Sequence, residues 1–131
     1  MKKGIDFNDK LTNIYQLRQL AQDFVDEREW GRYHNPKDLS ISIAIEAAEL
    51  MEHFQWVGQG DVVKIMENAE KFVSVKEELA DVMILCLNLA NNLDIDISQA
   101  IAEKIEKNKA KYPAELVRGN YRKYTELKEQ L

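Results

Sequence analysis

Four acidic side chains, Glu46, Glu49, Glu78 and Asp81, stand in two otherwise apolar stretches of this chain. The members of each pair are three residues apart, a spacing that places both carboxylates on one face of a helix. We expect that face to be largely buried, where an unpaired carboxylate costs on the order of several kcal/mol. Neither stretch contains a lysine or an arginine. The counter-charge for this acidic cluster must therefore come from elsewhere.

A divalent metal ion is the simplest counter-charge for the acidic cluster. Carboxylates offer oxygen ligands, which magnesium and manganese prefer, whereas zinc favours histidine or cysteine. Magnesium keeps several waters and shares its coordination shell with substrate phosphates. The sequence therefore predicts an Mg²⁺ site, with Mn²⁺ as a substitute, that acts on a phosphate substrate.

A di-iron centre is another site that helical bundles build from inward carboxylates. That centre needs a glutamate followed three residues later by a histidine. The residue three before His53 is Leu50, and the residue three before His34 is Gly31. The chain therefore lacks the di-iron pattern, and we interpret His53 as an ordinary helix histidine.

Two further groups of residues are candidates for binding a phosphate-bearing ligand. Lys104, Asn108 and Tyr112, here called the polar stripe, are spaced by four and align on one helix face. A lysine-rich face is usually only solvated, so this prediction depends on the acidic cluster. A second group, the aromatic trio, flanks turns at helix ends, where a ring can stack on a base and an imidazole can hydrogen-bond; core packing is the commoner use of tryptophan. The trio consists of Trp30, His34 and Trp56.

Composition favours one all-α domain over residues 1–131. The chain is 45% hydrophobic and contains only two prolines and five glycines, which is typical of a helical protein with a real core. Its net charge of −5 argues against a nucleic-acid polymer as a partner but allows a small anion bridged by metal.

Location is predicted from the cysteine content and the hydropathy pattern. Cys86 is the only cysteine, so it forms no internal disulfide, and we expect a packed, inert thiol in a reducing cytoplasm. The N-terminal residues lack an apolar signal stretch, and the longest uncharged stretch, Val82 to Leu93, is too short to span a bilayer. We therefore expect a cytoplasmic protein without a membrane partner.

Hydrophobic periodicity and turn residues predict four main helices that form a four-helix bundle. The second and third of these helices carry the acidic pairs and must pack side by side if the pairs are to share ions. Ser98 is the expected N-cap of the fourth helix, and Pro113 is expected to end it. Residues 114–131 form an extended polar tail with room for a last helix over 121–131. The expected main helices run from residue 9 or 12 to 31, 36 or 38 to 56, 73 to 93 and 98 to 111, with a short helix within 61–71.

The sequence segments around these residues resemble those of a known family. Glu46-x-x-Glu49 followed by Glu78-x-x-Asp81 is similar to the signature of the MazG-like all-α nucleoside triphosphate pyrophosphohydrolases. The segments REWGRYHNPKDLSISIAIEAAELMEHFQW, KEELADVMILCLNLANNLDID and EKIEKNKAKYP resemble most the branch of single-domain dCTP pyrophosphatases. The resemblance covers nearly the whole chain.

The resemblance implies magnesium-dependent cleavage between the α and β phosphates of a nucleoside triphosphate, with dCTP or a modified pyrimidine nucleotide as the expected substrate. It implies that the acidic cluster holds the metal, that the polar stripe contacts phosphates and sugar, and that the aromatic trio surrounds the base. We assign the general base to Glu46 or Glu49. The family also assembles as homodimers or homotetramers. Some relatives have a polar or aromatic pocket residue at the position of Ala21 on the first helix. We therefore do not assign their base selectivity to this chain.

Two other functions compete with the enzyme. A non-catalytic helical oligomer would keep the acidic cluster to bind metal or nucleotide without turnover. A plain helical assembly protein would leave its acids solvated, and its thermal stability would not respond to Mg²⁺ or to a chelator. Pyrophosphate release from a panel of triphosphates separates the enzyme from the first alternative.

Overall fold

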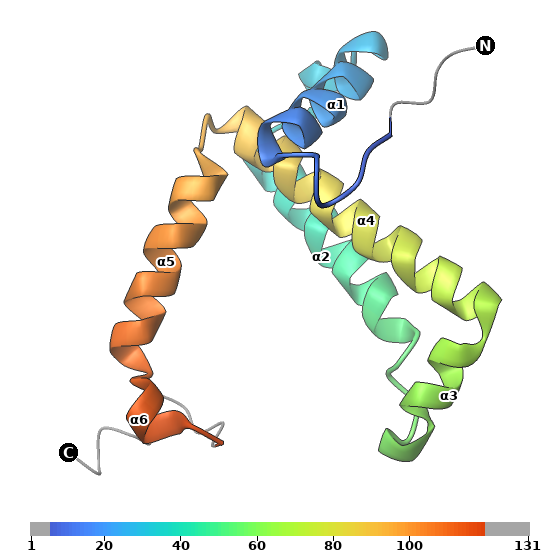
Figure 1. The fold of residues 1–131 in the computed structure, drawn as a ribbon. Coiled ribbons are helices and arrows are strands. Elements are labelled where there is room, and N and C mark those ends of the chain that lie inside the picture. The colour runs from blue at the N-terminus through green and yellow to red at the C-terminus, as the bar shows by residue number, and fades with distance from the viewer. Residues whose placement is uncertain (1–5, 120–131) are drawn as a thin grey trace. The chain divides into compact units, whose positions relative to one another are not determined.

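The computed structural model describes residues 6–119, and all regular structure in that range is helical. The all-α prediction is confirmed. Within this range no helix is long and apolar enough to cross a membrane. The α-helices are α1 (Ile14–Glu27), α2 (Pro36–Glu52), α3 (Val62–Glu67), α4 (Ala69–Asn92), α5 (Ile97–Lys111) and α6 (Ala114–Val117), and two short 3-10 helices span Trp30–Tyr33 and Gln59–Asp61 (Figure 1).

The chain divides into two compact units. The first unit, Met1–Ile95, contains α1 to α4, and the second unit, Asp96–Leu131, contains α5 and α6. A single domain over the whole chain, with α5 as the fourth helix of a bundle, stays a prediction.

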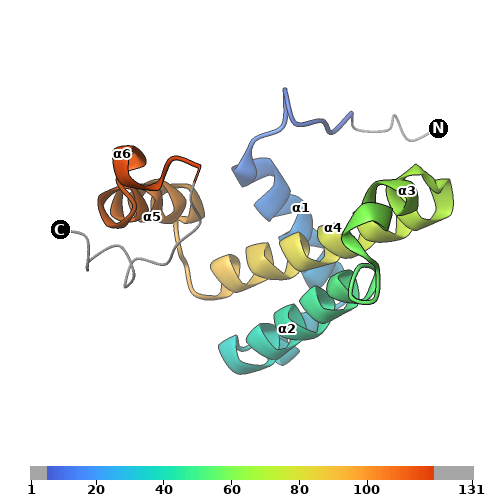
Figure 2. The same ribbon diagram turned by 90° about the horizontal axis from the view of Figure 1, so that it is seen from below.

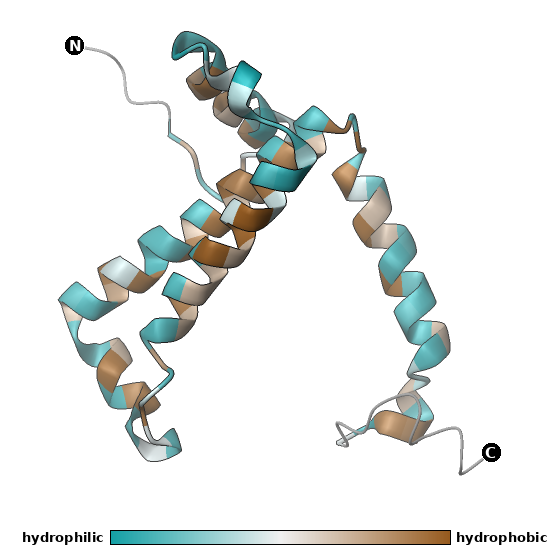
Figure 3. Ribbon diagram, turned by 180° about the vertical axis from the view of Figure 1, so that it is seen from behind, coloured by the Kyte–Doolittle hydropathy of each residue, from teal (hydrophilic) through white to brown (hydrophobic). Residues whose placement is uncertain are grey.

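Helices α2 and α4 form the most extensive helix pair in the first unit. They lie side by side in both views, and α1 packs against α4 (Figures 1 and 2). The predicted pairing of the two acidic helices is therefore confirmed. Apolar stretches of α2 and α4 run together along this seam (Figure 3). The buried apolar side chains of the described residues are Ala21, Val25, Leu39, Leu87 and Ala90.

Side-chain hydrogen bonds fix α1 on the end of α4. Arg18 Nε donates to Asn91 Oδ1 at 2.8 Å, and Arg18 Nη1 donates to the carbonyl of Ile95 at 2.6 Å. Asn91 Nδ2 returns a bond to the Arg18 carbonyl. Arg18 and Asn91 thus each donate a hydrogen bond to the other residue. These polar contacts, together with packing, fix the point where α1 crosses α4.

Several large apolar side chains of α1 and α4 are exposed in the single chain, including Leu20, Met83 and Ile84. Cys86 is exposed as well. The prediction of a packed thiol is therefore wrong for this structure. The reason is geometric: α4 is covered by α2 and α1 on part of its circumference only, so its apolar sequence does not imply burial on every side.

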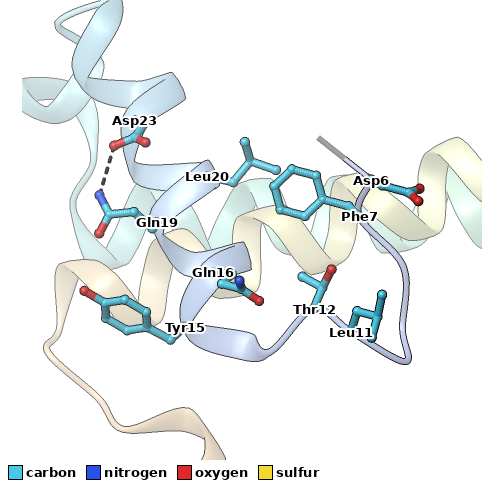
Figure 4. A pocket seen from close by; sticks show the side chains of 9 residues that line it. All are labelled: Asp6, Phe7, Leu11, Thr12, Tyr15, Gln16, Gln19, Leu20 and Asp23. Carbon is cyan, nitrogen blue, oxygen red and sulfur yellow. Dashed lines mark hydrogen bonds between the residues drawn. The ribbon is translucent and has the colours of Figure 1, made fainter. Parts of the chain in front are cut away.

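The segment before α1 folds along one face of that helix. A pocket of about 450 Å³ lies between them, and Figure 4 shows its lining side chains with the bond from Gln19 to Asp23. Phe7 and Leu20 line it together with polar residues of α1. None of the predicted site residues lines this pocket.

The first helix starts later and ends earlier than predicted. Asn13 forms a capping box with Gln16: Asn13 Oδ1 accepts the Gln16 amide at 2.9 Å, and Gln16 Oε1 accepts the Asn13 amide at 2.8 Å. The helix stops at Glu27, and Glu29 adopts a left-handed φ of 52° that reverses the chain. A 3-10 turn then replaces the predicted last helical turn.

The boundaries of α2 and α4 also differ from the prediction. Asn35 caps α2, with Pro36 in its first turn as expected, but the helix ends at Glu52 because the chain turns at Phe54, whose amide bonds to Met51. Helix α4 begins at Ala69 rather than residue 73 because Asn68 caps it. The short helix expected within 61–71 is α3.

Ser98 is not the N-cap of the following helix. Asp96 Oδ1 accepts the amide of Gln99 at 3.0 Å, which starts α5 at Ile97. Asp96, two residues before Ser98, is therefore the N-cap, because its side chain is the first that reaches the free backbone amides at the start of α5. The helix ends at Lys111, before Pro113, as predicted. The last helix expected over 121–131 lies outside the described residues.

This correction can be tested by amide hydrogen exchange. We expect Asp96→Ala to accelerate exchange in the first turn of α5 roughly fivefold, because an N-cap contributes about 1 kcal/mol. Ser98→Ala is the matched control and should leave those rates unchanged. Faster exchange in Ser98→Ala than in Asp96→Ala would show that Ser98 is the N-cap.

Candidate functional site

Packing of α2 on α4 brings the acidic cluster together. The pKa of Glu46 is raised above its ordinary value of 4.5, first because burial desolvates its carboxylate. A side-chain hydrogen bond with Glu49 and the negative charge of Glu49 add to the rise, followed by the charges of Asp81 and Glu78. Glu46 is therefore repelled by Glu49 on its own helix and by Asp81 and Glu78 across the seam.

The burial of these acids is less complete than predicted. Glu46 and Glu78 are half-buried, whereas Glu49 and Asp81 are exposed. Residues three apart on a helix point about 60° away from each other, so one member of each pair faces the seam and the other faces its rim. The expectation of a largely buried face is thus wrong for Glu49 and Asp81.

His53 meets one of these acids directly. Its Nε2 lies 2.5 Å from Oε2 of Glu78, and both side chains are mostly buried, with 15% and 24% of their surface exposed. The imidazole follows α2 as its C-cap. The spacing of Glu46, Glu49 and His53 places all three on one helix face. This spacing indicates that His53 lies near the acids, which the interpretation of His53 as an ordinary helix histidine did not include.

The chemistry of the acidic cluster fits a divalent cation. Its donors are all carboxylate oxygens, which is the ligand set of magnesium and manganese. Oε2 of Glu46 is buried and accepts no hydrogen bond from the part of the chain that the structure describes. Within residues 6–119, however, no three His, Cys, Asp or Glu side chains lie close enough together to hold a metal ion. Magnesium binding therefore stays a prediction.

A pocket of about 220 Å³ lies beside the acidic cluster. It brings together members of two predicted groups, because its lining includes Glu46 and Asp81 as well as Trp30 and His34. A volume below the roughly 300–1,000 Å³ of a whole small-molecule site suits one part of a nucleotide, such as its base. The remaining lining residues are Phe24, Val25, Ile84, Leu85 and Asn88.

The aromatic side of this pocket is positioned by the chain reversal after α1. The left-handed Glu29 directs the 3-10 turn back, so that the Trp30 ring meets Phe24 edge-on at 5.8 Å between centroids. Arg28 lies over the same Phe24 ring, 3.7 Å from its centroid. The carbonyl of His34 accepts a bond from Asn92 at the end of α4. Trp30 and His34 are therefore held against α1 and α4 by named contacts.

The other predicted residues lie elsewhere. Trp56 follows α2, is 87% exposed and does not line this pocket. Lys104, Asn108 and Tyr112 belong to the second unit, where the Asn108 carbonyl accepts the amide of Tyr112 at the end of α5. Their participation in a common site with the acidic cluster stays a prediction.

Two pocket residues were missed by the sequence analysis. Phe24 is one of several apolar residues in the first helix, and its sequence position gives no sign of a place in the pocket. Asn88 is 7% exposed and is the buried polar residue among those described. It lies seven residues after Asp81, two helical turns along the same face of α4. A lone amide in the run VMILCLNLA was the available signal.

Comparison with known proteins identifies the family. The MazG-like family profile matches residues 41–127, which include both acidic pairs and the polar stripe. The chain belongs to the MazG-like family. This MazG-like chain is also 36% identical over 114 residues to human dCTP pyrophosphatase 1, covering 87% of the chain and 67% of that protein. The mouse protein of the same name is 34% identical over the same coverage.

A solved structure supports the fold of this MazG-like chain. The crystal structure of a pyrophosphatase from Archaeoglobus fulgidus superposes with a TM-score of 0.72 at 37% sequence identity. The match covers 82% of this chain and 99% of the other. The predicted family and its all-α fold are thereby confirmed.

The raised pKa of Glu46 predicts a pH-dependent stability in the metal-free protein. A carboxyl with a raised pKa in the folded state stabilises below its ordinary value of 4.5, and this contribution is lost as pH rises through the raised value. With chelator present, the melting temperature of Glu46→Gln should therefore exceed that of the wild type by a margin that grows from about pH 4.5 to 7.5. A margin that stays constant would contradict the raised pKa of Glu46.

The contact between His53 and Glu78 predicts a second stability effect. We expect His53→Ala to lower the free energy of unfolding by about 1–3 kcal/mol in the metal-free protein, because a mostly buried carboxylate oxygen loses its partner. Denaturant unfolding measures the change. The double variant with Glu78→Gln should cost less than the sum of the single variants, and strict additivity would show that the two side chains do not interact.

Proposed function

We propose that this MazG-like chain hydrolyses nucleoside triphosphates between the α and β phosphates, with Mg²⁺ as its cofactor. Water is added, and the products are the nucleoside monophosphate and pyrophosphate. One observation carries the proposal: a single pocket joins Trp30 and His34 to Glu46 and Asp81. A flat base and its phosphates need these two kinds of surface next to each other.

The acidic cluster would hold the metal. Bound there, Mg²⁺ supplies charge neutralisation of the triphosphate and a lower pKa for a coordinated water. The cluster suits this role because burial and then the negative charges of Glu49, Asp81 and Glu78 raise the pKa of Glu46, and a cation would offset both. Glu49 and Asp81 are exposed at the rim, where they are accessible to an ion and to a phosphate chain.

Glu46 is the residue we favour as general base. A carboxylate accepts a proton more readily when its pKa is raised toward the working pH, and desolvation together with three neighbouring acids raises the pKa of Glu46. Its buried Oε2 has no donor among the described residues and remains available as an acceptor. Of the two glutamates that the sequence left open, Glu46 therefore fits this role better than the exposed Glu49.

The base is the second recognition element. Trp30 and His34 both line a pocket of base-like size, and an indole ring there could stack on a base. We propose dCTP or a modified pyrimidine nucleotide as the substrate, supported by the similarity to proteins called dCTP pyrophosphatase 1. Hydrolysis of such nucleotides would remove them from the pool available for DNA synthesis.

The phosphate and sugar contacts are proposed to come from the polar stripe. Lys104 is exposed on α5 and would stabilise the negative charge that develops on the departing pyrophosphate. We also propose a homodimer or homotetramer, because large apolar side chains of α1 and α4 lie exposed in the single chain. Trp56, which is almost fully exposed, would reach a base only in such an assembly.

Glu49→Gln tests the proposed function. The change keeps the side-chain volume and removes one charge, so we expect pyrophosphate release from dCTP to fall by at least about 100-fold while the helical fold is retained. Glu52→Gln is the matched control, because Glu52 is exposed at the end of the same helix and should leave turnover unchanged.

The wild-type protein decides between the enzyme and the metal-binding oligomer. Incubation with Mg²⁺ and a panel of natural and modified triphosphates should release pyrophosphate from at least one pyrimidine nucleotide. No release from any triphosphate, together with bound nucleotide in calorimetry, would favour a non-catalytic binding protein.

A further inference from the structure

Asn88 is an unusual residue for its place in the fold. It is 7% exposed on the apolar face of α4, beside the buried Leu87 and Ala90. Its Oδ1 is fully buried and receives no hydrogen bond from any described residue. A buried polar group without a partner destabilises a protein relative to an apolar side chain of similar shape. Packing of the helix therefore does not explain an asparagine here.

The surroundings of Asn88 point to a ligand. The residue lines the pocket that also contains Trp30, His34, Glu46 and Asp81. Because Asn88 follows Asp81 by two helical turns, their backbone positions are separated by about 10 Å along α4. A nucleoside placed with its sugar toward the acids would carry its base toward Asn88. The rest of the lining from α4, Ile84 and Leu85, is apolar and offers no competing hydrogen bond.

We propose that Asn88 is a specificity-determining residue whose buried carboxamide oxygen accepts a hydrogen bond from the exocyclic amine of a pyrimidine base. This inference rests on the proposed function and names how its substrate is read. Cytosine presents an amine donor at C4, whereas uracil and thymine present an oxygen acceptor there. A carboxamide oxygen pairs with the amine and not with the carbonyl.

The recognition also has an energetic consequence for the free protein. The unpaired oxygen of Asn88 finds its partner only when the base is bound, so the free enzyme carries a destabilising group that improves selectivity. Replacement by leucine, which has a similar shape and no polar atom, should preserve or raise the thermal stability of the nucleotide-free protein. The same replacement should remove the preference for an amine-bearing base.

The test compares dCTP with dUTP, which differ at C4 by one amine against one oxygen. We expect the wild type to favour dCTP in kcat/KM, and Asn88→Leu to reduce this ratio by about 10- to 100-fold without a lower melting temperature. Asn88→Asp keeps only acceptors, so it should retain or increase the ratio even if its added charge lowers both rates. Asn88→Ala, which cannot clash, repeats the comparison if the leucine variant folds poorly.

Several results would overturn the proposal. These are an absence of discrimination in the wild type, an unchanged ratio in both apolar variants, or equal losses for the two nucleotides accompanied by a lower melting temperature. A protein that releases no pyrophosphate would instead refute the proposed function. In that case calorimetric binding of dCMP and dUMP to the wild type and to Asn88→Leu tests the same hydrogen bond without turnover, and equal affinities in the wild type would overturn it.

Discussion

Repulsion among the carboxylates of α2 and α4 is the constraint on which this structure depends. The seam between these helices is the most extensive in the first unit. Burial there raises the pKa of Glu46, and the like charges of Glu49, Asp81 and Glu78 add to the rise. Apolar burial along the seam must offset that repulsion. A cation bound at this seam, as proposed, would relieve the repulsion.

Other features of the first unit follow from this arrangement. His53 lies directly against Glu78, and no other acid of the cluster forms an ion pair with a described residue. The reversal at Glu29 returns the chain so that Trp30 and His34 flank the acids. Asn88 adds an unpaired amide to the same pocket. The left-handed Glu29 and the unpaired oxygen of Asn88 cost strain or stability, and such costs gather where a protein binds a ligand.

Local sequence signals predicted the helices well and their ends poorly. The acidic helices were found because their apolar periodicity is long and their charges are few. Their limits differ because a cap depends on which side chain first reaches a free amide: Asn13 begins α1, Asn68 begins α4 and Asp96 displaces Ser98 at α5. Burial was predicted too uniformly for Cys86, Glu49 and Asp81, since an apolar run does not say how much of a helix its neighbours cover.

The residues of the acidic cluster, their spacing and the likeness to the MazG-like family were determined by sequence alone, because helical periodicity and oxygen-ligand chemistry are local properties. Tertiary structure decided which residues share a pocket. It joined Trp30 and His34 to Glu46 and Asp81, added Phe24 and Asn88, and left Trp56 outside. These contacts depend on how α1, α2 and α4 cross and on one left-handed residue, and such long-range geometry arises only when the helices pack together.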